Sequence, residues 1–223
     1  MFTREELLIG NKIEDLKKKR ILVLGVGGVG GYVVESLGRA GIGHLILVDY
    51  DTVDISNINR QIIATHSNIG KLKVDCFKER IKDINPECEV ITLPIFYNSD
   101  NKDLLFSTKI DYVIDCCDSL EAKKNVIIEC IARNIPVISS MGTGNKFHPE
   151  LFKITKLKKT EYDPLAKKLR YLLKDKKELL ETEVLYSTEK PVEYKGKIGS
   201  ISYVPSVAGL LIVSYVINKF IEK

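Results

Sequence analysis

The sequence predicts an α/β protein with a doubly wound, Rossmann-like, mostly parallel sheet that is extended by antiparallel strands in the C-terminal half. From residue 20 onward, short apolar runs alternate with longer segments of helical period, which is typical of βαβ units. With 223 residues and 44% hydrophobic positions, the chain can bury roughly 70% of its unfolded surface without disulfides or metals. We expect one domain, made of an arm (1–20), a first half (21–145) and a second half (146–223).

The first half contains five predicted strands and the helices that connect them. The strands are apolar runs next to Gly, Asp or Pro, at residues 21–25, 45–49, 90–93, 112–115 and 136–139. The helices cover residues 28–40, 71–84, 100–106 and 119–134. Because a helix can cross over between successive strands, the pattern favours a parallel sheet with helices on both faces.

The pattern changes after residue 144. Residues 152–157 alternate between apolar and polar, as in an antiparallel strand, and residues 164–177 predict a basic helix. Two short strands are expected at residues 184–187 and 200–204, followed by a packed terminal helix that ends near residue 221. Pro205, three polar residues (Ser206, Ser214 and Asn218) and Lys219 interrupt this last apolar segment, so we expect no membrane span.

The cysteines and the N-terminus exclude several classes of protein. The five cysteines form no C-x-x-C pair, so we expect neither a zinc site nor a thioredoxin-type motif. Reduced thiols are typical of the cytoplasm, which is the expected location. Residues 1–20 lack the apolar segment of a secretory signal.

A glycine-rich turn at residues 25–30 follows the first predicted strand and opens a helix. Its glycines, which we take as nucleotide contacts, are Gly25, Gly27, Gly28 and Gly30. The N–H groups of such a turn and the positive end of the helix bind phosphate. Asp49 ends the second strand and is placed to accept a ribose hydroxyl. This pair fits a dehydrogenase that uses NAD or FAD and a nucleotide-activating enzyme equally well. A glycine turn that serves packing alone is a third interpretation.

A polar block after Asp49 favours nucleotide activation. It supplies Asp51, Asn57, Arg60, Gln61 and Lys73. An enzyme that cleaves between the α- and β-phosphates of ATP uses fixed positive charges, because negative charge builds on the bridging oxygen and on the leaving pyrophosphate. A solvated polar loop is the alternative.

Asp118 and Ser119 follow the fourth predicted strand, where open α/β sheets bind ligands. A carboxylate at this position can hold Mg²⁺ against the phosphates of ATP. Alternatively, Asp118 is the N-cap of the helix that begins near Ser119. The residues alone leave both interpretations open.

As a set, these residues resemble the adenylation fold shared by ubiquitin-activating enzymes and their bacterial relatives in molybdopterin and thiamine synthesis. The resemblance implies that Gly28 lies against the nucleotide, that Asp49 binds the ribose, that Asn57, Arg60 and Lys73 contact the phosphates, and that Asp118 holds Mg²⁺. It also implies a homodimer in which Arg4 reaches the ATP of the neighbouring subunit. A surface arginine is the alternative for Arg4.

The second half resembles the branch of this family that dehydrates threonylcarbamoyladenosine in tRNA. The matching runs are residues 139–146, 159–170, 184–189 and 199–209. The chain lacks the zinc cysteines and the crossover cysteine usual in sulfur-carrier activators. The resemblance implies that ATP activates the threonylcarbamoyl carboxylate on a tRNA adenosine, that the group then cyclises with loss of AMP, and that a sulfur-relay protein is a possible partner. A sulfur-carrier activator and an NAD-binding oxidoreductase are the alternatives.

The net charge of +4 is unevenly distributed. Residues 153–177 hold ten basic and three acidic residues, a net of +7, so the rest of the chain carries −3. Such a segment can bind RNA phosphates, and the candidates are Lys158, Lys159, Lys167, Lys168 and Arg170. Tyr162 and Tyr171 lie within it and can stack on unpaired bases. A solvated helix with inward tyrosines is the alternative.

Overall fold

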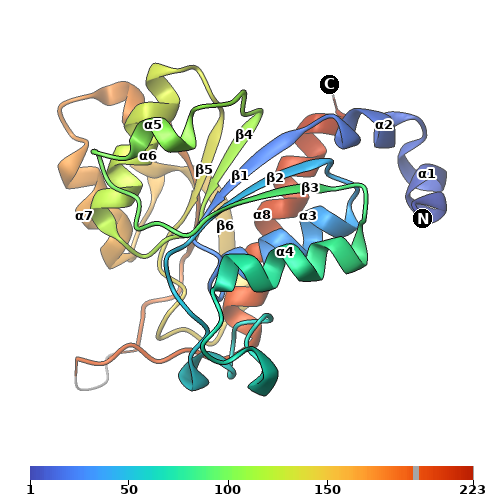
Figure 1. Cartoon of the computed structure of the whole chain (residues 1–223). Coiled ribbons are helices and arrows are strands. Elements are labelled where there is room, and N and C mark those ends of the chain that lie inside the picture. Colours follow the sequence, from blue (N-terminus) through green and yellow to red (C-terminus); the bar gives the residue numbers. More distant parts are fainter. Residues whose placement is uncertain (193–195, 223) are drawn as a thin grey trace.

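The computed structural model describes residues 1–192 and 196–222, and a seven-stranded sheet crosses this part of the chain in the order β3-β2-β1-β4-β5-β7-β6 (Figure 1). The strands are β1 (Arg20–Leu24), β2 (His44–Val48), β3 (Glu89–Leu93), β4 (Tyr112–Asp115), β5 (Val137–Ser140), β6 (Phe152–Lys156) and β7 (Glu183–Ser187). All neighbours pair in parallel except β6 with β7. The predicted fold class is therefore confirmed, and both halves of the chain contribute to one sheet.

Helices cover both faces of the sheet. They are α1 (Thr3–Ile9), α2 (Lys12–Lys17), α3 (Gly30–Arg39), α4 (Lys73–Ile84), α5 (Lys102–Leu105), α6 (Leu120–Ala132), α7 (Pro164–Leu172) and α8 (Tyr203–Ile221). Short 3₁₀ turns occupy Ile55–Asn57, His66–Asn68, Pro149–Leu151, Leu157–Lys159 and Lys177–Glu181. Helices α3, α4 and α8 lie on one face, and α5 and α6 lie on the other with α7 beside them (Figure 1).

Strand β1 shows why the sheet needs both layers. Its side chains alternate between faces, so Ile21 and Val23 pack with α3, α4 and α8, whereas Leu22 and Leu24 pack with α5 and α6. All four side chains are buried. A continuous apolar run is what a central parallel strand requires, because helices cover it on both sides.

Two predicted boundaries in the second half are wrong. Residues 200–204 form no strand, because α8 already begins at Tyr203; Pro205 fits the first turn of a helix, where its missing N–H has no intrahelical partner. Helix α7 ends at Leu172 and not at residue 177. The buried stripe of Ala166, Leu169 and Leu173 would continue at Lys176 and Lys177, which are both exposed.

Helix α8 packs one face into the core and leaves Leu210 and Leu211 partly exposed on the other. By length and composition alone it would be able to cross a membrane. It instead packs so closely against α3 that a Cβ on Gly209 would lie 2.5 Å from the carbonyl oxygen of Val29. Its residues Ala208, Ile212 and Val216 are fully buried in the main core. The prediction of a packed terminal helix is confirmed.

Candidate active site

The glycine turn brings the ends of β1 and β4 into close contact. Gly25 has a φ of +83°, and a Cβ there would lie 2.8 Å from the backbone nitrogen of Cys117. A Cβ on Gly30 would lie 1.8 Å from the carbonyl oxygen of Gly25. Only glycine fits at these two positions, so they allow the tight turn from β1 into α3.

A cavity of about 660 Å³ opens at the carboxyl ends of the parallel strands, which is a usual size for a small-molecule site. Its lining includes these predicted nucleotide contacts: Gly25, Gly27, Gly28, Asp49, Asp51, Asn57, Arg60, Gln61, Lys73, Asp118 and Ser119. Gly30 does not line the cavity. Arg4, which is exposed on α1, does not line it either, and α1 lies at the far end of the molecule (Figure 1).

Asp49 connects β2 to the glycine turn. One of its carboxylate oxygens accepts a hydrogen bond from the N–H of Val26 at 2.8 Å, and the other accepts from the N–H of Asp51 at 2.9 Å. Burial raises the pKa of Asp49 above its ordinary value, although both hydrogen bonds favour the charged form. The side chain is therefore held in one orientation at the cavity wall.

The polar block places two cations at the cavity. The Arg60 guanidinium donates through Nη1 to the carbonyl of Ser56 at 2.9 Å and to Oδ1 of Asn59 at 2.8 Å. Lys73 begins α4, is 4% exposed, and lies with Nζ 2.8 Å from a carboxylate oxygen of Asp51. Each cation is thus held by a few contacts, and an ammonium and a guanidinium have further N–H groups to donate.

Two amides complete this part of the wall. Asn57 is buried, and its Oδ1 accepts from the N–H of Asp54 at 3.1 Å, which closes the capping box of the 3₁₀ turn Ile55–Asn57. Gln61 is also buried, and its Oε1 has no hydrogen-bond partner among the described residues. A buried polar atom without a partner is costly, so Gln61 fits a cavity that receives a polar ligand.

Ser119, and not Asp118, is the N-cap of α6. The Ser119 hydroxyl accepts from the N–H of Ala122 at 3.3 Å, so the N-cap interpretation of Asp118 is wrong. The Asp118 side chain is exposed at the cavity. Its carboxylate therefore stands where a ligand or a cation can reach it.

A fully buried polar cluster behind this wall was not predicted from the sequence. Lys123 Nζ lies 3.0 Å from a carboxylate oxygen of Asp115, and the Ser139 hydroxyl donates to the same oxygen at 2.5 Å. Burial alone lowers the pKa of Lys123, but the neighbouring Asp115, Cys117 and Cys116 raise it, and the pKa lies above its ordinary value. The detectable signal was the spacing of Lys123 with Ile127 and Cys130, which puts the lysine on a buried helix stripe.

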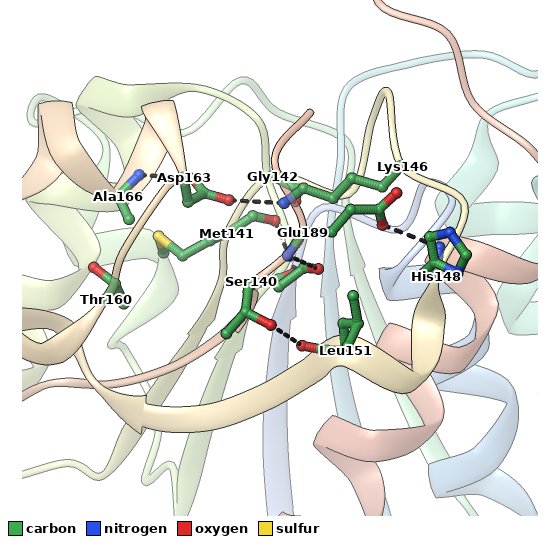
Figure 2. Close-up of polar contacts among 12 residues, drawn as sticks. Ser140, Met141, Gly142, Lys146, His148, Leu151, Thr160, Asp163, Ala166 and Glu189 are labelled. Carbon is green, nitrogen blue, oxygen red and sulfur yellow. Dashed lines mark hydrogen bonds and ion pairs between the residues drawn. The ribbon is translucent and has the colours of Figure 1, made fainter. Parts of the chain in front are cut away.

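A second buried pair, drawn in Figure 2, lines the cavity beyond the end of β5. In the sheet, β5 lies on the other side of β4 from β1 and β2, and we call this part of the cavity the acceptor end. Lys146 Nζ donates to the carbonyl of Gly142 at 2.6 Å and lies 3.1 Å from a carboxylate oxygen of Asp163. The other oxygen of Asp163 accepts from the N–H of Ala166 at 2.9 Å and caps α7. Asp163 thus fastens the loop after β5 to the start of the basic helix.

The basic segment, residues 153–177, reaches this end of the cavity through Lys168. Lys159, Lys167 and Lys168 are exposed. Lys158 pairs with Glu181, and Arg170 donates to the carbonyl of Thr160 at 2.9 Å, so these two predicted RNA contacts also serve the fold. The alternative of inward tyrosines is wrong, because Tyr162 is 57% and Tyr171 is 68% exposed.

Known proteins are similar to nearly the whole chain, including the residues at both ends of the cavity. A sequence model of the ThiF family matches residues 4–223. The tRNA threonylcarbamoyladenosine dehydratase of Bacillus subtilis (strain 168) is 42% identical over 240 residues, which cover 99% of this chain and 94% of that protein. A crystal structure of the E. coli tRNA N6-threonylcarbamoyladenosine dehydratase in complex with ATP superposes with a TM-score of 0.94 at 36% identity, over 99% of this chain and 93% of that chain.

Similarity to a sulfur-transfer enzyme is shorter. An adenylyltransferase and sulfurtransferase of Saccharomyces cerevisiae (strain YJM789) is 35% identical over 131 residues. The match covers 59% of this chain and 30% of that protein. Similarity to the dehydratases therefore extends through nearly the whole chain, whereas similarity to the sulfurtransferase does not.

The buried cluster generates a stability prediction. Lys123→Met leaves the Asp115 charge buried with neutral donors but without a counter-charge, so we expect the free energy of unfolding to fall by about 3–5 kcal/mol. Urea denaturation followed by circular dichroism measures this. The double variant Lys123→Met with Asp115→Asn should recover part of the loss, because no charge is then buried. Lys124→Met is the control: its side chain is partly exposed and pairs with Glu121 on the same helix, so the change in stability should be less than about 1 kcal/mol. An equally small loss for Lys123→Met would contradict the prediction.

Proposed function

The chain belongs to the ThiF family, and we propose that it is an ATP-dependent dehydratase of tRNA threonylcarbamoyladenosine. The observation that carries the proposal is one cavity with two ends. The glycine turn, Arg60 and Lys73 line the nucleotide end, and the acceptor end adjoins Lys168 of the basic segment. An enzyme that adenylates a group on RNA needs both ends in one cavity.

The nucleotide end supplies groups for each part of ATP. The backbone N–H groups of Gly27 and Gly28 and the start of α3 face the phosphates, and Asp49 accepts a ribose hydroxyl. Arg60 and Lys73, with Asn57 and Gln61, stabilise the negative charge that develops when the bond to pyrophosphate breaks. Because Asp51 holds Lys73 at 2.8 Å, the ammonium is positioned before the reaction begins.

We assign Asp118 to Mg²⁺. Magnesium is usually held by one or two carboxylates together with phosphate oxygens and water, and seldom by a cage of protein groups. Within residues 1–192 and 196–222, no three His, Cys, Asp or Glu side chains are grouped to hold a metal ion. One exposed carboxylate at the cavity fits a cation that arrives with ATP, and the ion would neutralise charge on the phosphates.

The acceptor end binds the threonylcarbamoyl group of the tRNA. A carboxylate oxygen of this group attacks the α-phosphorus of ATP, and pyrophosphate leaves. Ring closure then forms a bond from a nucleophilic atom of the same group to the activated carbonyl carbon. The carbon–oxygen bond to AMP breaks, and the nucleophilic atom releases its proton to solvent. The nucleophile belongs to the reacting group itself, so its effective concentration is high and no covalent carrier is required.

The cysteines favour a reaction in which the adenylate is consumed directly, without a thioester intermediate. The last cysteine in the sequence is Cys130, which is buried in α6. Cys116 and Cys117 line the cavity, but burial raises the pKa of both far above the ordinary value of a thiol. None of these three thiols is suited to a thioester relay. This argues against the sulfur-carrier activator, and an oxidoreductase has little need for Arg60 and Lys73 beside the glycine turn.

The remaining assignments concern assembly and location. We expect a homodimer in which Arg4 reaches the neighbour's ATP, because Arg4 is exposed and remote from the cavity of its own chain. A sulfur-relay protein is a possible further partner. The five cysteines are free thiols in the structure, as suits a reducing compartment such as the cytoplasm.

The reaction itself is the first test. Purified protein incubated with ATP, Mg²⁺ and tRNA bearing threonylcarbamoyladenosine should form AMP and pyrophosphate. Mass spectrometry of the digested nucleosides should show the loss of one water from the modified adenosine. Turnover of ATP without this mass change, or exchange of ATP with pyrophosphate that is stimulated by a small carrier protein and not by tRNA, would contradict the proposal.

Removal of the phosphate-binding cations should abolish most of this activity. We expect Arg60→Ala and Lys73→Ala each to lower the rate of AMP formation by about 10²- to 10³-fold or more, since each removes a donor to developing charge. The matched control is Lys71→Ala, an exposed lysine two positions from Lys73. Rates within a few-fold of wild type for both site variants would refute these roles.

The basic segment should govern affinity for tRNA. The double variant Lys167→Ala with Lys168→Ala should raise the Kd for tRNA and reduce the slope of log Kd against log salt concentration by about 2, near one for each phosphate that is no longer bound. Filter binding at several salt concentrations measures both. The control is the double variant Lys18→Ala with Lys109→Ala, which removes the same charge near the amino ends of the strands. It should leave the slope unchanged. Equal slopes for the two double variants would contradict the assignment of Lys167 and Lys168 to tRNA binding.

A further inference from the structure

An exposed tyrosine in a strained backbone conformation stands beside the acceptor end. Tyr162 has a φ of +57°, which is unusual for a bulky residue. The N–H of Asp163 donates to the carbonyl of Glu161 at 2.7 Å, so Tyr162 is the central residue of a three-residue turn of the strained kind. The turn leaves 57% of the side chain exposed. Strain of this sort persists only where the surroundings enforce it.

The buried pair Lys146–Asp163 enforces it. Asp163 is 2% exposed, and both of its carboxylate oxygens are engaged, one by Lys146 and the other by the N–H of Ala166 (Figure 2). A residue held at this many points fixes the path of the chain immediately before it. Tyr162 is therefore held in its exposed position by two buried charges and a helix cap.

The surroundings of Tyr162 complement a nucleotide. The Nζ of Lys190 lies 5.1 Å from the centroid of the Tyr162 ring. Asp163, Pro164 and Lys168, which follow in sequence, line the cavity. A planar ring with one lysine beside it thus directly precedes, in sequence, residues that line the cavity. An unpaired nucleotide offers a flat base to the ring and a phosphate to a lysine.

Tyr171 provides a comparison within the same segment. Its ring is 68% exposed and Lys174 lies over it at 4.6 Å, so its chemistry matches that of Tyr162. Neither ring lines the cavity, but Tyr162 directly precedes Asp163, which does, whereas Tyr171 lies inside α7 about one turn beyond Lys168. Position in the fold, and not residue type, separates the two tyrosines.

We propose that Tyr162 is the stacking platform for an unpaired base next to the target adenosine, and that it thereby places the threonylcarbamoyl group at the acceptor end. This inference rests on the proposed function. It adds a subsite for a second nucleotide of the RNA, in which the ring binds the base and the Lys146–Asp163 pair acts as a positioning element. The adenosine that reacts is then held from one side by its neighbour.

The test uses the whole protein and tRNA that bears threonylcarbamoyladenosine and carries 2-aminopurine at the nucleotide on one side of it or the other. Stacking on Tyr162 should quench the fluorescence of one of these probes on binding. Tyr162→Asn removes the ring, and asparagine tolerates a positive φ, so the variant should fold with an unchanged or raised Tm. We expect its Kd for tRNA to be about 5- to 150-fold higher, as for the loss of one stacked base, with the quenching abolished.

Three further measurements serve as controls. Tyr162→Phe should restore the wild-type Kd and the quenching, because the ring is kept. Tyr171→Leu should change the Kd by less than about 2-fold, and ATP binding should be unaffected in every variant. If the wild-type enzyme dehydrates the tRNA but Tyr162→Asn binds it with unchanged affinity and quenching, the inference fails and the proposed function stands. If the wild-type protein neither binds nor dehydrates the tRNA, the proposed function fails and the inference with it.

Discussion

The loops that line the cavity depend on a buried ion pair between Asp115 and Lys123, which the hydroxyl of Ser139 supports. The three residues belong to β4, α6 and β5, so the cluster joins two strands and a helix where the cavity begins. Asp115 also accepts from the N–H of Cys117 at 3.1 Å, and the same turn contacts the glycine turn at Gly25. Loss of one partner would leave a charge buried without compensation. The positions of Asp118 and of the glycine turn follow from this cluster.

Charged residues around the cavity divide into two kinds by their partners. The pairs Asp115–Lys123 and Asp163–Lys146 are almost fully buried and neutral as pairs, and they fix the shape of the two ends. Arg60, by contrast, is held through one nitrogen and keeps other donors for a ligand. The basic segment shows the same division, because Arg170 binds the backbone of Thr160 whereas Lys167 is exposed. A count of basic residues cannot separate these roles.

Much of the fold was predictable because periodicity is a local property. The run at residues 21–25 and the turn that follows predict a buried strand and a phosphate-binding turn without knowledge of the rest of the chain. The strand expected at residues 200–204 does not form. The same residues also suit the first turn of a helix, and the burial of Val204 and Pro205 in the core favours the helix over the strand. The predicted end of α7 is wrong because the residues that follow Leu173 are mostly lysines, which favour a helix by composition but do not extend its apolar face.

The sequence by itself determined the chemical inventory: a glycine turn, an acid 24 residues after Gly25, cations in the block that follows, a basic segment and no cysteine beyond Cys130. These are properties of residue type and spacing along the chain. Only the tertiary structure decided which of these groups share a cavity, that Ser119 caps α6 and leaves Asp118 exposed, and that Asp163 pairs with Lys146. The reason is physical: burial and pairing arise between residues far apart in sequence, and burial and pairing determine whether a charge supports the fold or meets a ligand.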